Sequence, residues 1–297
     1  LTEAENDTYS YDSCNNITSK TVNGKETSYI YYLANVQQQN ETTLKATSEG
    51  GVTKFYAYDE MGNMTLYKGS EQKGQNLNYT RGNMLRGGSI NGNTFTYEYG
   101  PDNLRYKKWA QELWKDNPFG FEIAFKITET YYYWDGDVLV GEKSNSDYTQ
   151  YLYDASGIIG MIYNGAYYYF EKNLFGDVIK AYDSNGVEVA SFIYSAYGEI
   201  LHKSGSMADK VHFRYRGYYY DNETGFYYLQ SRYYDPSICR FISADQYELL
   251  PVLSGSLGEL NLYSYCANNP IMYIDPSGEF AWTTALIILG IVSGALA

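Results

Sequence analysis

A tyrosine–aspartate unit recurs along this chain and constrains its fold more than any other feature. Residues 9–18 read YSYDSCNNIT, residues 56–65 read YAYDEMGNMT and residues 151–160 read YLYDASGIIG. Looser copies are AYDSNGVEVA at 181–190 and YEYGPDNLRY at 97–106. The distances between copies are unequal, so the units form a loose repeat and not a solenoid of fixed period.

Each unit predicts the end of a strand and a tight turn. Tyr56 and Tyr58 are two residues apart and therefore lie on one face of a strand. Asp59 can open the turn, because its carboxylate accepts hydrogen bonds from backbone amides about two residues further on. Gly62, or Asn in other copies, suits the positive φ that closes a hairpin. Repetition of the unit therefore predicts one hairpin after another, with tyrosines packed across neighbouring strands.

The composition agrees with a chain of many short strands. It holds 37 Tyr and 28 Gly residues in 297, and Tyr favours strands whereas Gly favours turns. We predict antiparallel β structure from residue 1 to about 245, with strands that end at Tyr11, Tyr58 and Tyr153. One unit cannot bury its own face, so a propeller, a β-solenoid or a curled sheet would each fit. Most tyrosines are then packing residues; exposed platforms for carbohydrate are the alternative.

Charge and composition exclude several classes of site. The net charge of −13 disfavours nucleic-acid binding and is compatible with a lumen for a basic cargo. Cys14, Cys239 and Cys266 lie far apart without a CxxC, which indicates neither a zinc site nor a disulfide framework. His202 and His212 are the only histidines, too few for a His-rich metal site. We therefore expect no metal and no cofactor.

Two stretches near the C-terminal end carry a family resemblance. Residues 213–245 read FRYRGYYYDNETGFYYLQSRYYDPSICRFISAD, and residues 261–278 read NLYSYCANNPIMYIDPSG. They resemble the core domain of Rhs proteins, and the tyrosine–aspartate units resemble the YD repeats of the same family. This family includes polymorphic toxins of contact-dependent competition, C subunits of insecticidal toxin complexes and, distantly, teneurins.

The resemblance implies an all-β fold in which hairpins spiral into a hollow, cocoon-like shell that the core domain closes. Residues 1–212 would be YD repeats from a longer shell, residues 213–279 the core domain, and residues 280–297 the start of a variable region. The enclosed partner would be the chain's own C-terminal effector, often a toxin. Secretion-system or cell-wall components are possible further partners, and the expected location is secreted or at the cell surface.

The resemblance also implies that the chain cuts itself after the core domain. Asp245 and Asp275 match the family's two cleavage positions, and paired carboxylates can share general acid and base roles in amide hydrolysis. Arg240 is the candidate arginine beside them. The expected bond is Glu279–Phe280. The alternative for Asp275 is a structural role, since Asp-Pro-Ser-Gly is a strong turn sequence.

The sequence also departs from the family pattern. Gln246 follows Asp245 where the family has proline, and residues 247–259, YELLPVLSGSLGE, are inserted before Asp275. This form resembles a variant of Gram-positive Rhs-like proteins, and it leaves self-cleavage open. Asp221 and Asp235 are interpreted as turn formers.

The end of the chain is apolar. Residues 280–297 carry no charge and predict a short helix, either buried at the start of the effector or inserted in a membrane. The first residue is Leu1, so we expect a piece of a longer polypeptide. Two other functions stay open: a cell-surface module that binds glycans or proteins of a neighbouring cell, and an inactive gene remnant. Exposed aromatics on an outer face would favour the binding module, whereas a concave face lined by polar residues would favour the shell.

Overall fold

The structure is a computed structural model that describes residues 7–32, 42–69, 75–113, 124–245, 261–279 and 282–283. One antiparallel sheet of 18 strands dominates this part of the chain. Its strands are β1 (Thr8–Tyr11), β2 (Ile17–Val22), β3 (Lys25–Tyr31), β4 (Leu44–Glu49), β5 (Val52–Tyr58), β6 (Met64–Gly69), β7 (Gln75–Thr80), β8 (Met84–Ile90), β9 (Asn93–Tyr99), β10 (Arg105–Leu113), β11 (Phe125–Asp135), β12 (Val138–Ser144), β13 (Asp147–Asp154), β14 (Gly157–Tyr163), β15 (Ala166–Lys172), β16 (Val178–Asp183), β17 (Glu188–Tyr194) and β18 (Ile200–Ser204). We call this sheet the wall.

The C-terminal part of the described chain, which we call the core segment (residues 213–245 and 261–279), holds shorter elements. They are the 3-10 helix η2 (Tyr215–Gly217), the four-stranded sheet of β19 (Tyr219–Asp221), β20 (Phe226–Tyr228), β21 (Tyr233–Asp235) and β22 (Arg240–Phe241), the 3-10 helix η4 (Cys266–Asn268), and β23 (Tyr273–Ile274), which pairs with β24 (Trp282–Thr283).

The tyrosine–aspartate unit forms the predicted turn. Asp59 Oδ1 accepts hydrogen bonds from the backbone N–H groups of Met61 and Asn63, both at 2.9 Å, and Gly62 has a φ of 80°. Strands β1 and β5 end at Tyr11 and Tyr58, as predicted. Strand β13 ends one residue beyond the predicted Tyr153. The side-chain hydrogen bonds of Asp59 explain why the turn begins directly after the second tyrosine.

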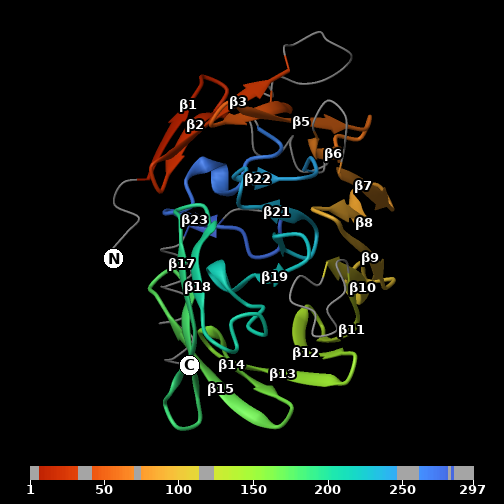
Figure 1. The fold of residues 1–297 in the computed structure, drawn as a ribbon, viewed down its shortest axis with the longest axis vertical. Coiled ribbons are helices and arrows are strands. Elements are labelled where there is room, and N and C mark those ends of the chain that lie inside the picture. The colour runs from red at the N-terminus through yellow and green to blue at the C-terminus, as the bar shows by residue number, and fades with distance from the viewer. Residues whose placement is uncertain are drawn as a thin grey trace.

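The wall curls into a ring. Each of its strands pairs with the next one in the chain, from β1–β2 to β17–β18. Figure 1 shows these strands following one another around the core-segment strands β19, β21 and β22. Side chains join the two ends of the wall: the hydroxyls of Tyr11 and Tyr197 lie 2.8 Å apart, and Lys20 Nζ lies 2.8 Å from Glu199 Oε2. Of the three architectures that the repeats allow, the curled sheet is therefore confirmed.

Aromatic side chains join the core segment to the inner face of the wall. Tyr97 stacks on Tyr233 with ring centroids 5.4 Å apart, and Tyr132 meets Tyr219 edge to face at 5.6 Å. Such ring pairs contribute about 0.5–1.5 kcal/mol each beyond the area that they bury. Tyrosine therefore serves mainly as a packing residue on this face, as the repeat predicted.

The predicted C-terminal helix is wrong where the structure can test it. Trp282 and Thr283 lie in β24 and pair with Ile274 and Tyr273, so the backbone is extended there. The rest of residues 280–297 lies outside the described residues. No helix within the described ranges is long and apolar enough to cross a membrane. The division into units at residues 212 and 279 stays a prediction.

Candidate functional site

One buried arginine brings the two predicted aspartates together. Arg232, directly before β21, places Nη2 3.1 Å from Asp245 Oδ2 and 3.7 Å from Asp275 Oδ2. The side chains of Arg232 and Asp275 are 4% and 3% exposed, whereas that of Asp245 is 30% exposed. The site therefore has one enclosed carboxylate and one that solvent can reach.

The Asp-Pro-Ser-Gly sequence forms a turn, and its aspartate also belongs to this site. Asp275 Oδ1 accepts a 2.8 Å hydrogen bond from the N–H of Gly278, which has a φ of 78°. The N–H of Asp275 donates to Tyr218 Oη at 3.2 Å. The two interpretations of Asp275 in the sequence therefore do not exclude each other, because one oxygen closes the turn while the other faces Arg232.

The backbone that leads to the predicted cleavage bond is held from two sides. Arg232 Nε donates to the carbonyl of Gly278, and Ser231 Oγ donates to the carbonyl of Ser277 at 2.7 Å. Glu279 follows and is exposed. Phe280, the other residue of the predicted bond, lies outside the described residues. The chain is thus fixed within two residues of the expected bond.

Neighbouring groups fix the guanidinium of Arg232. It lies 3.8 Å from the centre of the Phe241 ring, and its Nη1 donates to the carbonyl of Leu262 at 3.2 Å. Burial lowers the pKa of Arg232, and the charges of Asp245, Asp275 and Glu279 raise it in part. A planar arginine with several fixed donors is suited to holding two carboxylates in one geometry.

Arg240, the arginine suggested by the sequence, lies in another environment. Its Nη2 donates to the carbonyl of Thr42 at 2.7 Å and to Asn261 Oδ1 at 3.3 Å. Its guanidinium lies over the rings of Tyr31 and Tyr263, at 5.3 and 5.0 Å from their centres. The short strand β22 directs Arg240 toward the wall, so it joins the core segment to the wall instead of supporting Asp245.

The sequence did not identify Arg232 as a partner of Asp245, because the two residues are too far apart in the sequence to be brought together by a single turn or strand. The signal that could have identified it is its place in the Arg-Tyr-Tyr-Asp-Pro stretch of the core-like sequence. Pairing of β21 with β22 brings the two segments together. Ile242 and Asp245 then donate backbone N–H groups to the carbonyls of Tyr233 and Leu262, at 3.1 and 3.0 Å.

The other acidic residues of the core segment have structural roles. Asp235 Oδ1 accepts hydrogen bonds from the N–H and Oγ of Ser237, at 2.8 and 2.6 Å, which confirms a turn former. Asp221 opens a turn through its carbonyl, which accepts from the N–H of Gly225 at 2.8 Å. Its carboxylate, however, faces Arg105 and Lys108 of the wall, an ion pair that the sequence did not predict.

The two buried cysteines of the core segment are poor candidates for a nucleophile. Burial raises the pKa of Cys239 and of Cys266 to about 12, so both are protonated thiols at neutral pH. All three cysteines are free of disulfides. Within the described ranges, no three His, Cys, Asp or Glu side chains cluster as metal ligands.

Comparison with known proteins gives the family. A model of the teneurin YD-shell matches residues 2–271. The tRNA3(Ser)-specific nuclease WapA of Bacillus spizizenii is 32% identical over 271 residues, which cover 80% of this chain and 11% of that protein. The toxin protein Tse5 of Pseudomonas aeruginosa is 39% identical over 84 residues, which cover 28% of this chain and 5% of that protein.

Solved structures agree with the fold. The structure of TcdB2-TccC3-Cdc42 matches with a TM-score of 0.59 at 19% identity, over 97% of this chain and 16% of that chain. The chain spans about a tenth of the length of the WapA relative. From the family match, the repeats and the curled wall, we conclude that the chain belongs to the teneurin YD-shell family and is a YD-repeat shell of the Rhs type.

Proposed function

We propose that this chain is the closing part of a YD-repeat shell that encloses a C-terminal effector, and that it cuts itself once between Glu279 and Phe280. The observation that carries the proposal is Arg232, which lies between Asp245 and Asp275 and holds the carbonyl of Gly278. Relatives named as a tRNA nuclease and as a toxin support an effector as cargo.

The proposed reaction is hydrolysis of one amide bond. Asp245 is the more exposed carboxylate and the closer one to Arg232, so we assign it as the general base that takes a proton from water. The water oxygen attacks the carbonyl carbon of Glu279. Asp275, in its protonated form, gives a proton to the amide nitrogen of Phe280 as the C–N bond breaks. The products are a carboxyl group at Glu279 and an amino group at Phe280.

The test uses a chain continued beyond Ala297 by a soluble reporter domain, with intact mass as the measurement. We expect the wild type to break at Glu279–Phe280 and the Asp245→Asn and Asp275→Asn variants to stay full length. Asp183→Asn, at an exposed turn of the wall, is the matched control and should still be cut. An uncut wild type would leave a purely structural shell.

Enclosure needs its own test. We propose that the parent protein is secreted or at the cell surface, where secretion-system or cell-wall components could bind it. In the intact parent, the region that follows the core segment should resist protease until the shell is denatured. Digestion of that region at the same rate as in an isolated effector would contradict enclosure.

Exposed tyrosines support a second candidate function, binding of glycans by the outer face of the wall. Tyr133, Tyr148, Tyr167 and Tyr169 are exposed on β11, β13 and β15. Exposed aromatic rings were the feature expected of a cell-surface binding module. If this function holds, Tyr148→Ala with Tyr167→Ala should abolish retention on immobilised cell-wall polysaccharide, whereas retention unchanged by the two substitutions would exclude it.

A further inference from the structure

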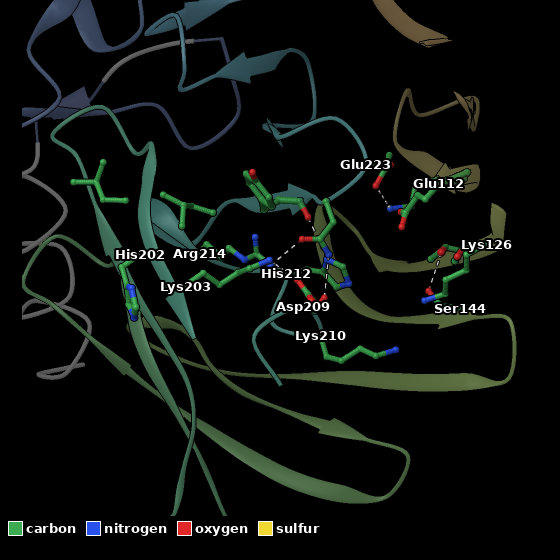
Figure 2. Close-up of a pocket in the computed structure, with 18 residues that line it drawn as sticks. Glu112, Lys126, Ser144, His202, Lys203, Asp209, Lys210, His212, Arg214 and Glu223 are labelled. Carbon is green, nitrogen blue, oxygen red and sulfur yellow. Dashed lines mark hydrogen bonds and ion pairs between the residues drawn. The ribbon is translucent and has the colours of Figure 1, made fainter. Parts of the chain in front are cut away.

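Two cavities lie between the inner face of the wall and the core segment. The first has a volume of about 540 Å³ and the second of about 470 Å³. Ile200 and Leu201, at the start of β18, line both. Figure 2 shows the first cavity, with Lys203 and Arg214 near each other on one side and Lys126 on the opposite side.

The strand registers place both cavities inside the ring. Residues of one strand face alternate, so Lys126, Thr128, Thr130 and Tyr132 of β11 share a face. Tyr132 packs on Tyr219 of the core segment, while the other three line the first cavity. On β5, Val52 and Lys54 share a face with the buried Tyr56 and line the second cavity with it. On β11, the same strand face therefore packs against the core segment at Tyr132 and lines a cavity from Lys126 to Thr130.

The second cavity is rich in lysine. Lys20, Lys25, Lys54 and Lys68 line it, with Glu49 and Glu199 as its only acidic side chains among the described residues. Glu199 is already paired with Lys20 at 2.8 Å. Lys25 and Lys54 form no ion pair with a described residue. Both side chains are exposed, and both line the cavity.

The lysines of this cavity repel one another. Burial lowers the pKa of Lys68; the charge of Asp235 opposes this, while the charges of Lys54 and Lys20 lower the pKa further. Lys68 Nζ donates to the neutral Ser237 Oγ at 2.6 Å and not to a carboxylate. A negative group placed here would therefore meet several cations that the protein itself has not neutralised.

The first cavity has the same excess of positive charge. Lys108, Lys126, Lys203, Lys210 and Arg214 line it, against Glu112, Asp209 and Glu223. Glu223 is paired with Lys108 at 3.1 Å, and Asp209 is paired with Lys203. Lys210 is paired with Asp147, which does not line the cavity, at 2.8 Å. Lys126 forms no ion pair with any residue that the structure describes.

Basic side chains are thus over-represented among the residues that line the two cavities. The two cavities take nine of the chain's 22 Lys and Arg residues but only five of its 35 Asp and Glu residues. The net charge of the whole chain is −13, so the remainder is strongly acidic. The overall charge is compatible with a basic cargo, whereas the lining of these two cavities favours an acidic one.

We propose that these two cavities bind acidic, Asp- and Glu-rich segments of the polypeptide that the shell encloses. The inference rests on the proposed function of enclosure. A C-terminal region of the same chain is tethered to the core segment and need not approach from outside, whereas a nucleic acid would have to approach an acidic exterior that repels phosphate. Pockets for small molecules are mostly apolar, unlike these lysine-lined cavities.

The test is site-specific crosslinking in the parent polypeptide with its C-terminal region present. Val52→p-benzoylphenylalanine places the crosslinker in the second cavity, and Thr53→p-benzoylphenylalanine places it on the opposite face of the same strand as a matched control. Crosslinked peptides are identified by mass spectrometry. We expect acidic peptides of the C-terminal region from position 52 and none from position 53.

A charge variant tests the cause. Lys25→Gln with Lys54→Gln, added to the crosslinker at position 52, should lower the yield of acidic peptides about three- to tenfold, because two exposed charge contacts are lost. Both lysines are exposed, so folding should persist, and circular dichroism checks it. An unchanged yield would overturn the inference.

The remaining outcomes separate the inference from the function on which it rests. Crosslinks to neutral or basic peptides of the C-terminal region would overturn acidic recognition but keep enclosure. Crosslinks to RNA would overturn the inference in favour of a nucleic acid. If position 52 gives no crosslink to the C-terminal region and protease digests that region in the intact parent, enclosure itself would be overturned.

Discussion

Arg105 of β10 and Asp221 of β19 form a two-pronged ion pair between the wall and the core segment. Nη1 lies 2.6 Å from Oδ2 and Nη2 lies 3.0 Å from Oδ1, and the two side chains are 1% and 0% exposed. Lys108 Nζ adds a contact of 3.2 Å to Asp221. Five tyrosine rings have their centres 4.5 to 5.9 Å from the guanidinium.

This pair predicts a large effect of its loss on stability. Arg105→Met leaves the buried carboxylate of Asp221 with one cation instead of two, so the free energy of unfolding should fall by about 3–5 kcal/mol. Urea denaturation followed by tyrosine fluorescence measures it. Lys180→Met removes a half-exposed pair with Glu188 and should leave the denaturation midpoint unchanged. A loss below about 1 kcal/mol for Arg105→Met would mean that Lys108 alone satisfies Asp221.

The site predicts that Arg232, and not Arg240, supports self-cleavage. In the reporter chain, Arg232→Lys keeps the positive charge but loses the fork that reaches both carboxylates and the Gly278 carbonyl. We expect the cleaved fraction to fall at least about tenfold, the loss that removal of a positioning contact commonly causes. Arg240→Lys is the matched control and should be cut like the wild type once circular dichroism shows that it is folded. Equal cleavage of the two variants would remove Arg232 from the mechanism.

The turn at Gly62 predicts a contrast between two glycines. A Cβ on Gly62 would lie 2.7 Å from Tyr263 Oη and 2.9 Å from the Cβ of Ala244, and the residue has a φ of 80°. Gly62→Ala should therefore lower the free energy of unfolding by about 2–4 kcal/mol, from strain and overpacking together. Gly50 has a φ of 56° with nothing within 4 Å of such a Cβ, so Gly50→Ala should cost only about 1 kcal/mol. Equal losses measured by urea denaturation would show that packing on Tyr263 does not matter.

His212 predicts a loss of stability in mild acid. Burial lowers its pKa, Glu142 raises it in part from a distance of 3.6 Å, and Lys108 and Arg214 lower it further. The unfolded chain therefore takes up the proton at a higher pH, near 6.5, than the folded chain does. The neutral form stabilises the fold above pH 6.5, and this stability decreases as the pH falls below that value.

The slope of this decrease is at most about 1.4 kcal/mol per pH unit for one proton. Unfolding by urea at pH 7.5 and at pH 5.5 measures it, and His212→Gln should reduce the difference between the two. His202→Gln, at an exposed position of β18, is the control and should leave the difference as in the wild type. If the difference in stability between the two pH values is unchanged in His212→Gln, other titrating groups cause it.

The local parts of this structure could be predicted from the sequence. The turn after Tyr58 depends on Asp59, Gly62 and Asn63, so the chemistry lies within five consecutive positions. The family resemblance predicted that the sheet curls into a shell and that Asp245 and Asp275 form a pair. The repeat alone predicts neither. Arg232 lies within 3.7 Å of both Asp245 and Asp275, and the role of the pair in cleavage stays a proposal.

Contacts between distant strands could not be predicted in the same way. Arg240 is nearer to Asp245 in the sequence, and only the pairing of β21 with β22 shows that Arg232 lies beside Asp245 instead. Likewise, the net charge of −13 gives no information on which lysines face inward, because a shift of one residue would turn Lys54 outward. The positive charge of the inner cavities could therefore be recognised only once the register of the paired strands was known.

The order of pairing along the wall has a consequence for how the protein is made. Each wall strand needs only its predecessor, so hairpins can form one after another as the chain leaves the ribosome. The contacts that fasten the core segment span far longer separations, 116 residues for Arg105 with Asp221 and 217 for Lys20 with Ser237. During synthesis the wall can therefore fold before the core segment packs against it. Any residues encoded beyond residue 279 are made last, when the inner face of the wall has already formed.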